Sequence, residues 1–179
     1  MNLQDAIKLI QPAVIHQTQP STWADLGCGS GLFTTALSSL LVQGSIVYAV
    51  DENKNALNKI KPIEGIELKK IVSNFEKDEL PLQDLDGLLM ANSLHYVKDK
   101  TTFVKKAMKW MKNESSFIIV EYDTNKSNHW VPYPISFDSL QKLFAEFGLT
   151  ASKIGEHQSI YQRAGMYCAK VLPHASRFV

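Results

Sequence analysis

The chain alternates between short apolar runs and longer segments in which apolar residues recur every three or four positions. The first pattern predicts strands buried on both faces of a parallel sheet, and the second predicts amphipathic helices. The predicted strands are 22–26, 45–50, 66–72, 85–91 and 116–121. The predicted helices are 3–15, 32–41, 53–60, one that begins at Asp99, and one that Ser136 caps and Gly148 ends. The remaining segment, 149–172, predicts two strands around a turn at 162–165.

This order of a helix, five strand–helix units and a closing pair of strands predicts an α/β fold. We expect a Rossmann-like, doubly wound, mostly parallel seven-stranded sheet, with helices on both faces and an antiparallel C-terminal strand. A length of 179 residues fits one domain, so residues 1–179 are predicted to form a single domain with an N-terminal helical segment at 1–20. Ligands of such sheets bind beyond the carboxyl ends of the strands. Functional residues are therefore expected in the loops 27–31, 51–53, 73–76, 92–97 and 122–135.

Charge and composition narrow the possible partners. The net charge is +1, and only Arg163 and Arg177 are arginines among 19 basic residues, which argues against a nucleic-acid partner. No apolar run approaches the roughly 20 residues of a membrane span. The N-terminus lacks the pattern of a signal peptide. Cys28 and Cys168 have no zinc-type spacing, so we expect reduced thiols in a cytoplasmic protein without a metal site.

A glycine cluster, Gly27-Cys28-Gly29-Ser30-Gly31, follows the first predicted strand and opens a helix. The free N–H groups and partial positive charge of a helix start suit a polar or charged ligand. A P-loop would continue with Lys after the last glycine, and a dinucleotide fingerprint would have a small residue where Leu32 stands. What remains is G-x-G-x-G, with Asp25 two residues before the first glycine.

The segment 23–31 resembles the first motif of class I S-adenosylmethionine-dependent methyltransferases. Three later features agree with this family in order: Asp51 ending the second strand, the segment 73–75 after the third, and the strand and loop 85–97. The resemblance extends from about residue 23 to 120, and more loosely to the end. It implies a methyltransferase that uses S-adenosylmethionine and acts on an unidentified, small-molecule acceptor.

The resemblance also implies which residues bind the cofactor: Asp25, Gly27, Gly29, Gly31, Asp51, Asn74, Phe75 and Asn92. The 27–31 backbone would take the methionine end, Asp25 would favour its ammonium, and Asp51 would accept from both ribose hydroxyls. Asn74 would bond an edge of the adenine, and Phe75 would cover its ring. Other interpretations stay open at this stage: Asp25 as a turn residue, Asp51 as a helix N-cap, and Phe75 as a core residue.

Methyl transfer from a sulfonium depends mainly on alignment, and a general base helps only when the acceptor must lose a proton. His95, just past the fourth strand, is the candidate base, with a structural or substrate-shaping role as the alternative. Tyr122, Trp130 and Tyr133 are candidates for the acceptor pocket, or they seal the edge of the sheet. Two other functions stay possible: a non-catalytic subunit that binds S-adenosylmethionine, and a nicotinamide-dependent oxidoreductase. The expected assembly is a monomer or a homodimer.

Overall fold

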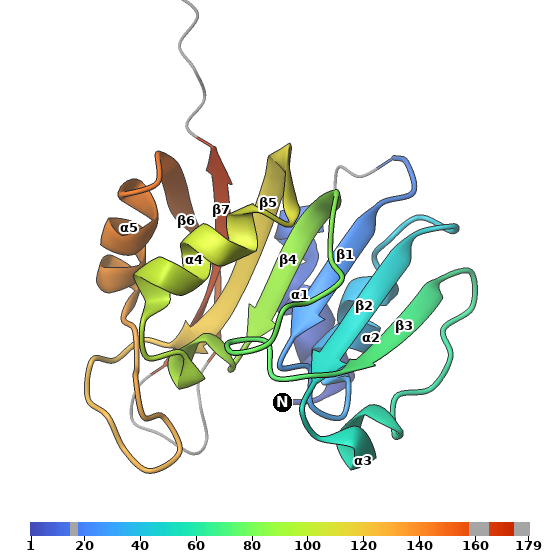
Figure 1. The fold of residues 1–179 in the computed structure, drawn as a ribbon, viewed down its shortest axis with the longest axis horizontal. Helices are drawn as coiled ribbons and strands as arrows, with labels where there is room; N and C mark the ends of the chain where they lie inside the picture. Colours follow the sequence, from blue (N-terminus) through green and yellow to red (C-terminus); the bar gives the residue numbers. More distant parts are fainter. Residues whose placement is uncertain (15–17, 158–164, 174–179) are drawn as a thin grey trace, which may run out of the picture.

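The computed structural model describes residues 1–14, 18–157 and 165–173, and its centre is a seven-stranded sheet in the order β3-β2-β1-β4-β5-β7-β6 (Figure 1). The strands are β1 (Thr22–Leu26), β2 (Ile46–Asp51), β3 (Glu67–Val72), β4 (Leu85–Ala91), β5 (Met111–Tyr122), β6 (Leu149–His157) and β7 (Met166–Pro173). Neighbouring strands from β3 to β5 are parallel, whereas β7 is antiparallel to β5 and to β6. The predicted mostly parallel sheet with an antiparallel C-terminal strand is confirmed.

Helices cover both faces of this sheet, as predicted (Figure 1). The helices are α1 (Leu3–Val14), α2 (Leu32–Ser38), α3 (Lys54–Leu57), α4 (Lys100–Met108) and α5 (Phe137–Ala145), with a short 3₁₀ helix η1 (Leu94–Tyr96) after β4. One apolar core lies between the sheet and α1 and α2, and the other lies between the sheet and α4 and α5. Because each helix has one apolar stripe, burying all of them requires two cores, one on each face.

The predicted count of five strand–helix units is one too many, because no helix lies between β3 and β4. Residues 73–84 form a loop that side chains hold in turns: Asp78 accepts hydrogen bonds from the hydroxyl of Ser73 and the N–H of Asn74, at 2.7 and 2.8 Å. Such local side-chain bonds offer the backbone an alternative to helix. The sequence analysis counted one strand–helix unit too many because it did not consider this turn chemistry.

Several boundaries also differ from the prediction. The strand expected at 116–121 begins at Met111, which pairs with Leu85 across a register shift in β4 and β5. The helices expected at 32–41 and 53–60 end earlier, as α2 and α3 show. The 1–20 segment forms α1, with residues 15–17 outside the described part of the chain. Of the predicted turn at 162–165, only Gly165 lies within the described residues.

A close contact at the centre of the sheet fixes how β1 lies beside β4. Trp23 is fully buried and pairs with Gly87 across the two strands, and its indole N–H donates to the hydroxyl of Ser21 at 3.1 Å. A Cβ added at position 87 would lie 2.2 Å from the Trp23 ring. Only glycine therefore lets the tryptophan lie flat over the neighbouring strand, with both strands in register.

Replacing Gly87 by alanine is therefore expected to destabilise the protein. The added methyl group would force the Trp23 ring or the strand to move, and overpacking of this kind costs about 1–3 kcal/mol. The free energy of unfolding in urea measures the effect. Gly165→Ala is the matched control, because neither position has a positive φ and an added Cβ at position 165 would meet only the carbonyl of His157, at 3.8 Å, among the described residues. A smaller loss for Gly87→Ala than for Gly165→Ala would contradict the proposed tight contact.

Candidate functional site

A cleft of about 420 Å³ opens at the carboxyl edge of the parallel strands. Its walls come from the loops that follow β1, β2, β3 and β4, which are four of the five loops predicted to carry function. Four of the predicted cofactor-binding residues line it together: Gly27, Asp51, Asn74 and Phe75. Residues from Gly27 to Tyr96 thus meet at one edge because parallel strands all end there.

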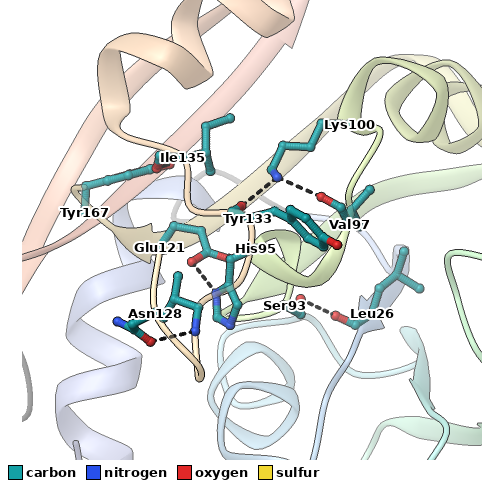
Figure 2. A network of polar contacts seen from close by, with 11 residues as sticks. Leu26, Ser93, His95, Val97, Lys100, Glu121, Asn128, Tyr133, Ile135 and Tyr167 are labelled. Atoms are coloured by element: carbon teal, nitrogen blue, oxygen red, sulfur yellow. Dashed lines mark hydrogen bonds and ion pairs between the residues drawn. The ribbon is translucent and has the colours of Figure 1, made fainter. Parts of the chain in front are cut away.

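The glycine loop is bonded to the end of β2 and packs tightly against the loop after β4. The N–H groups of Gly27 and Cys28 both donate to the carbonyl of Val50, at 2.8 and 3.1 Å. Gly27 has a φ of +73°, and an added Cβ would lie 2.5 Å from Cβ of Ser93 and 3.1 Å from the Phe75 ring. The hydroxyl of Ser93 donates in turn to the carbonyl of Leu26 at 2.6 Å (Figure 2). The floor of the cleft therefore requires glycine at this position.

The two other glycines of the loop differ in their surroundings. Gly31 is buried at the start of α2, where an added Cβ would lie 2.6 Å from Ile60, and it does not line the cleft. Gly29 has a φ of +54° and open space around it, and its N–H donates to a carboxylate oxygen of Asp51 at 2.8 Å. Gly31 therefore serves packing, while Gly29 links the loop to the acid that ends β2.

Asp51 lies on the wall of the cleft and organises the backbone around it. One of its oxygens accepts from Gly29, and the other accepts from the N–H of Asn53 at 2.8 Å. The N-cap of α3 is Asn53, whose side chain accepts from the N–H of Ala56, so the interpretation of Asp51 as the helix N-cap is wrong. Each carboxylate oxygen has a further lone pair, so Asp51 still has acceptor capacity for a bound ligand.

Asp25 lies behind the glycine loop and is almost fully buried, with 1% of its surface exposed. It belongs to β1, so the interpretation as a turn residue is wrong. The hydroxyl of Thr34 donates to its carboxyl group at 2.7 Å. Burial raises the pKa of Asp25 to about 7, with a smaller contribution from the charge of Asp51, while the Thr34 hydrogen bond opposes the shift. A cation bound in front of the loop would favour the ionised form of this acid.

Asn74 and Phe75 both line the cleft, and both also have structural contacts. The side chain of Asn74 accepts from the N–H groups of Glu76 and Lys77 and donates to the carboxylate of Glu52 at 2.9 Å. The Phe75 ring packs edge-to-face on Phe103 of α4, with ring centroids 5.8 Å apart. The interpretations of Phe75 as a core residue and as a cleft residue are therefore compatible, since different parts of the ring serve each.

Asn92 follows β4 in a left-handed conformation, with a φ of +54°. Its N–H donates to the carbonyl of Val120 at 2.8 Å. Its side-chain oxygen is enclosed and accepts no hydrogen bond, a condition it shares, among the described residues, with the hydroxyl of Ser38. An enclosed acceptor without a donor is costly unless a ligand completes it. Asn92 is not among the residues that line the cleft, so the structure does not bring this oxygen together with Gly27 and Asp51.

The structure pairs His95 with an acid that the sequence analysis did not identify. Glu121, near the end of β5, accepts from the backbone N–H of His95 at 3.0 Å with one oxygen and contacts ring Nδ1 at 2.8 Å with the other (Figure 2). His95 and Glu121 are only 3% and 1% exposed. A signal for Glu121 was present in the sequence, because one acid ends an otherwise apolar run at 117–120. The pairing of Glu121 with His95 could not be predicted before the fold was known, because the two residues are 26 positions apart.

The predicted acceptor-site aromatics separate into two groups. Tyr122 is half-buried, with its ring centroid 6.3 Å from that of His95, and the N–H of Tyr133 donates to the His95 carbonyl at 3.0 Å. Trp130 is 75% exposed and packs on His129 instead. Tyr96, which was not predicted, lines the cleft, and its ring is tilted against that of His95 with centroids 4.4 Å apart. The structure therefore brings the rings of Tyr96 and Tyr122 and the backbone of Tyr133 to the histidine, and no contact of Trp130 with it is found among the described residues.

Among the described residues, no group of three or more His, Cys, Asp or Glu side chains is placed to hold a metal ion. The helices in the described part of the chain are all too short or too polar to cross a bilayer.

The family of the chain follows from a match to the model of the methyltransferase domain over residues 24–119. This match spans more than half of the chain, from β1 through most of β5, and includes every loop of the cleft. The chain belongs to this methyltransferase family, and the class I S-adenosylmethionine-dependent assignment made from the sequence is confirmed. The enzyme is a methyltransferase, and its methyl donor is S-adenosylmethionine.

Solved structures share the fold at low sequence identity. The YcgJ protein of Bacillus subtilis is 13% identical with a TM-score of 0.73, covering 95% of this chain and 98% of its own. The magnesium protoporphyrin IX methyltransferase of Synechocystis, with bound S-adenosylmethionine, is 12% identical with a TM-score of 0.73, covering 96% and 79%. An S-adenosylmethionine-dependent methyltransferase from Listeria monocytogenes is 15% identical with a TM-score of 0.70, covering 95% and 99%. A search of the curated proteins finds no significant match.

The buried carboxyl group of Asp25 predicts a measurable effect of pH on stability. Its pKa is about 7 in the folded protein and near 3.8 when exposed, so between these values the unfolded chain ionises first. The free energy of unfolding should therefore fall as pH rises from 4 to 7, by up to about 1.4 kcal/mol per pH unit from this group. Asp25→Asn lacks this contribution, so its free energy of unfolding relative to that of the wild type should increase as pH rises from 4 to 7.

Urea unfolding of both proteins at several pH values between 4 and 8 measures this difference. Asp86→Asn serves as the control, because the Asp86 carboxylate also accepts a hydrogen bond, in its case from the N–H of Thr22, but lies at the amino end of β4 and is not fully buried. A constant difference between Asp25→Asn and the wild type over the whole pH range would contradict the raised pKa.

Proposed function

We propose that this methyltransferase holds S-adenosylmethionine in the cleft at the carboxyl edge and transfers its methyl group to a small-molecule acceptor. The observation that carries the proposal is the juxtaposition of Gly27 and Asp51 in one cleft. Gly27 presents backbone without a side chain at the floor of the cleft, where an added Cβ would collide with Ser93, and Asp51 offers carboxylate oxygens on the wall of the same cleft. A ligand with a ribose on one side and a charged amino-acid end on the other matches these two features.

The protein's own groups divide the cofactor between them. Asp51 accepts from the ribose hydroxyls, while Asn92 accepts from the ammonium of the methionine end, which requires its enclosed oxygen to turn toward the cleft. Asp25, behind the loop, adds negative charge that favours the cationic ligand. Phe75 covers the adenine, and its contact with Phe103 holds the ring in place. Because the side chain of Asn74 is engaged by its own loop, its part is to shape the adenine end.

The bound cofactor supplies a methyl group on a positively charged sulfur, which is already activated for in-line transfer. The chain then has to align an acceptor and, where needed, remove its proton. His95 is the proposed base, and Tyr122 and Tyr133 flank it as the acceptor side of the site. Trp130 lies further out, as an exposed contact for a part of the acceptor that projects from the site.

A small-molecule acceptor is favoured over a macromolecule by composition and by analogy. The net charge of +1 with two arginines gives little basis for holding a nucleic acid. The Synechocystis neighbour acts on magnesium protoporphyrin IX, and another neighbour, with a TM-score of 0.67, acts on plantazolicin. These resemblances support a small-molecule acceptor but do not identify it.

Calorimetric titration with S-adenosylmethionine, S-adenosylhomocysteine and NAD tests the cofactor assignment. The wild type should bind both sulfur compounds with micromolar affinity and should not bind NAD. Asp51→Asn should weaken both by at least tenfold, because a hydrogen bond to a charged group contributes about 1.5–3 kcal/mol. Asp86→Asn is the matched control, since it removes a carboxylate that also accepts a backbone N–H but lies at the other edge of the sheet.

Two results would contradict the proposal. Binding of NAD with no binding of the sulfur compounds would assign the cleft to a nicotinamide cofactor. Equal affinity in Asp51→Asn and the wild type would place the ribose elsewhere. If the sulfur compounds bind, release of S-adenosylhomocysteine with panels of phenols, amines, carboxylic acids and thiols then distinguishes an enzyme from a non-catalytic subunit.

A further inference from the structure

The pairing of His95 with Glu121 has a direct chemical consequence for the imidazole ring. A carboxylate only accepts hydrogen bonds, so the contact of 2.8 Å between Nδ1 and Glu121 requires the proton on Nδ1. In the neutral ring the lone pair then belongs to Nε2. Figure 2 shows Nδ1 turned toward Glu121, with the second ring nitrogen on the far side of the ring.

The second nitrogen is available to a ligand. Among the described residues, Nε2 of His95 has no hydrogen-bond partner, and it is not one of the enclosed atoms without a partner, which are on Ser38 and Asn92. Nε2 therefore has some exposure although the residue as a whole is 97% buried. Ser93 and Tyr96, two positions before and one position after His95, line the cofactor cleft, whereas Leu94 and His95 do not.

The backbone fixes the ring as firmly as the side chain does. Glu121 also accepts from the N–H of His95, and the carbonyl of His95 accepts from the N–H of Tyr133. The carbonyl of Tyr133 accepts from the ammonium of Lys100 at 2.7 Å, which also bonds the carbonyl of Val97 at 2.8 Å. These bonds join η1, β5, α4 and the loop before α5 (Figure 2). Such a network holds the ring in one orientation, which suits a positioned base.

We propose that Glu121 is the positioning residue of a His95–Glu121 pair, and that this pair selects an acceptor whose nucleophilic atom carries a proton, namely a hydroxyl or an amine. The inference rests on the proposed function. With a hydroxyl, Nε2 takes the O–H proton while an oxygen electron pair forms the new bond to the methyl carbon. With a neutral amine, the nitrogen lone pair forms that bond, and Nε2 takes an N–H proton from the resulting ammonium. The electron pair of the broken carbon–sulfur bond stays on sulfur, and the imidazolium later releases its proton to water.

Glu121 contributes in two ways that its amide analogue cannot reproduce. Its negative charge stabilises the imidazolium that forms during the reaction, and its acceptor-only oxygens keep the proton on Nδ1 in the resting state. In Glu121→Gln, the amide oxygen can still accept from the His95 backbone, but the amide NH₂ then faces Nδ1 as a donor. The lone pair would move to Nδ1 and the proton to Nε2, which would leave Nε2 unable to accept a proton.

Other ionisable groups pack around the pair and enter any pH dependence. Tyr96 and Tyr122 lie beside the His95 ring, while Lys100, Tyr122 and Tyr167 interact with the charge of Glu121. Burial and the charge of Glu121 raise the pKa of Tyr122 and of Tyr167, so both phenols stay neutral at ordinary pH. Burial lowers the pKa of Lys100, and Glu121 opposes that shift. Lys100 is therefore the group whose titration must be separated from that of the pair.

The tautomer of His95 can be measured without knowing the acceptor. Nitrogen-15 NMR of the imidazole groups, with His95→Gln to assign the signal, should show Nδ1 protonated and Nε2 unprotonated in the neutral wild-type ring. Glu121→Gln should show the reverse. Addition of S-adenosylhomocysteine should shift the Nε2 signal and leave the exposed His129 unchanged. A wild-type ring with the proton on Nε2, or with both tautomers in comparable amounts, would overturn the proposal even if the variant failed to fold.

Modification by diethyl pyrocarbonate, located by mass spectrometry, gives a pH profile of the same nitrogen. His95 should react at least tenfold more slowly in Glu121→Gln than in the wild type at the plateau, while His129 reacts equally in both. On acidification, the modification rate of His95 should fall off at a lower pH in Glu121→Gln than in the wild type. The reason is that the variant lacks the negative charge that stabilises the imidazolium. The same profile in Lys100→Gln isolates the contribution of Lys100.

The two proposals fail in different ways. If the wild type does not bind S-adenosylmethionine, the proposed function fails, while the tautomer of the free protein can still be measured. If the wild type binds the cofactor, but Glu121→Gln retains the wild-type tautomer, reactivity and pH profile, Glu121 has a structural role only. Turnover restricted to acceptors without a proton on the nucleophilic atom would also overturn the inferred selectivity.

Discussion

The close approach of β1 and β4 at the centre of the sheet is the constraint on which the site depends. Gly87 lets Trp23 lie across the two strands, and the strands then end at the same level. Their following loops meet at Gly27 and Ser93, where the Ser93 hydroxyl bonds the carbonyl of Leu26. The floor of the cleft is therefore a direct extension of the packing inside the sheet, and a change in one would displace the other.

Buried carboxyl groups divide the electrostatic tasks of this edge. Asp25 has one hydroxyl donor and a pKa near 7, so its charge depends on what is bound in front of the glycine loop. Glu121 has two donors from His95, which satisfy both of its oxygens. Asp51 is half-exposed and bonds two backbone N–H groups while facing the cleft. Three acids within one edge thus differ in function because their burial and their donors differ.

The tyrosines around His95 give the acceptor side a different character from the cofactor side. The cofactor cleft is lined by carboxylates, amides and glycine together with Phe75 and Tyr96, and the rings of Tyr96 and Tyr122 lie beside that of His95. Lys100 ties the Tyr133 loop to η1 through two carbonyl groups. Tyr96 therefore belongs to both sides, and the aromatic surface beside His95 matches a less polar acceptor.

The sequence by itself determined the class of fold, the glycine loop and the acid that ends β2, because apolar periodicity and glycine spacing are local properties. It also placed Asn74, Phe75, Asn92 and His95 at the carboxyl edge, since each comes directly after a strand. The sequence analysis overestimated the helices, because the turn bonds of Ser73, Asn74 and Asp78 compete with helix in a way that periodicity does not show.

Only the tertiary structure decided which groups face each other across the sheet. Glu121 is 26 positions from His95, and the two meet because β4 and β5 pair in parallel, in continuous register from Gly87 to Ala91. Gly31 is fixed by Ile60, and Trp130 is turned away from the histidine that Tyr122 and Tyr133 approach. Such contacts depend on strand order and on the burial of charge, which are properties of the whole packed chain, and no segment of the sequence specifies them alone.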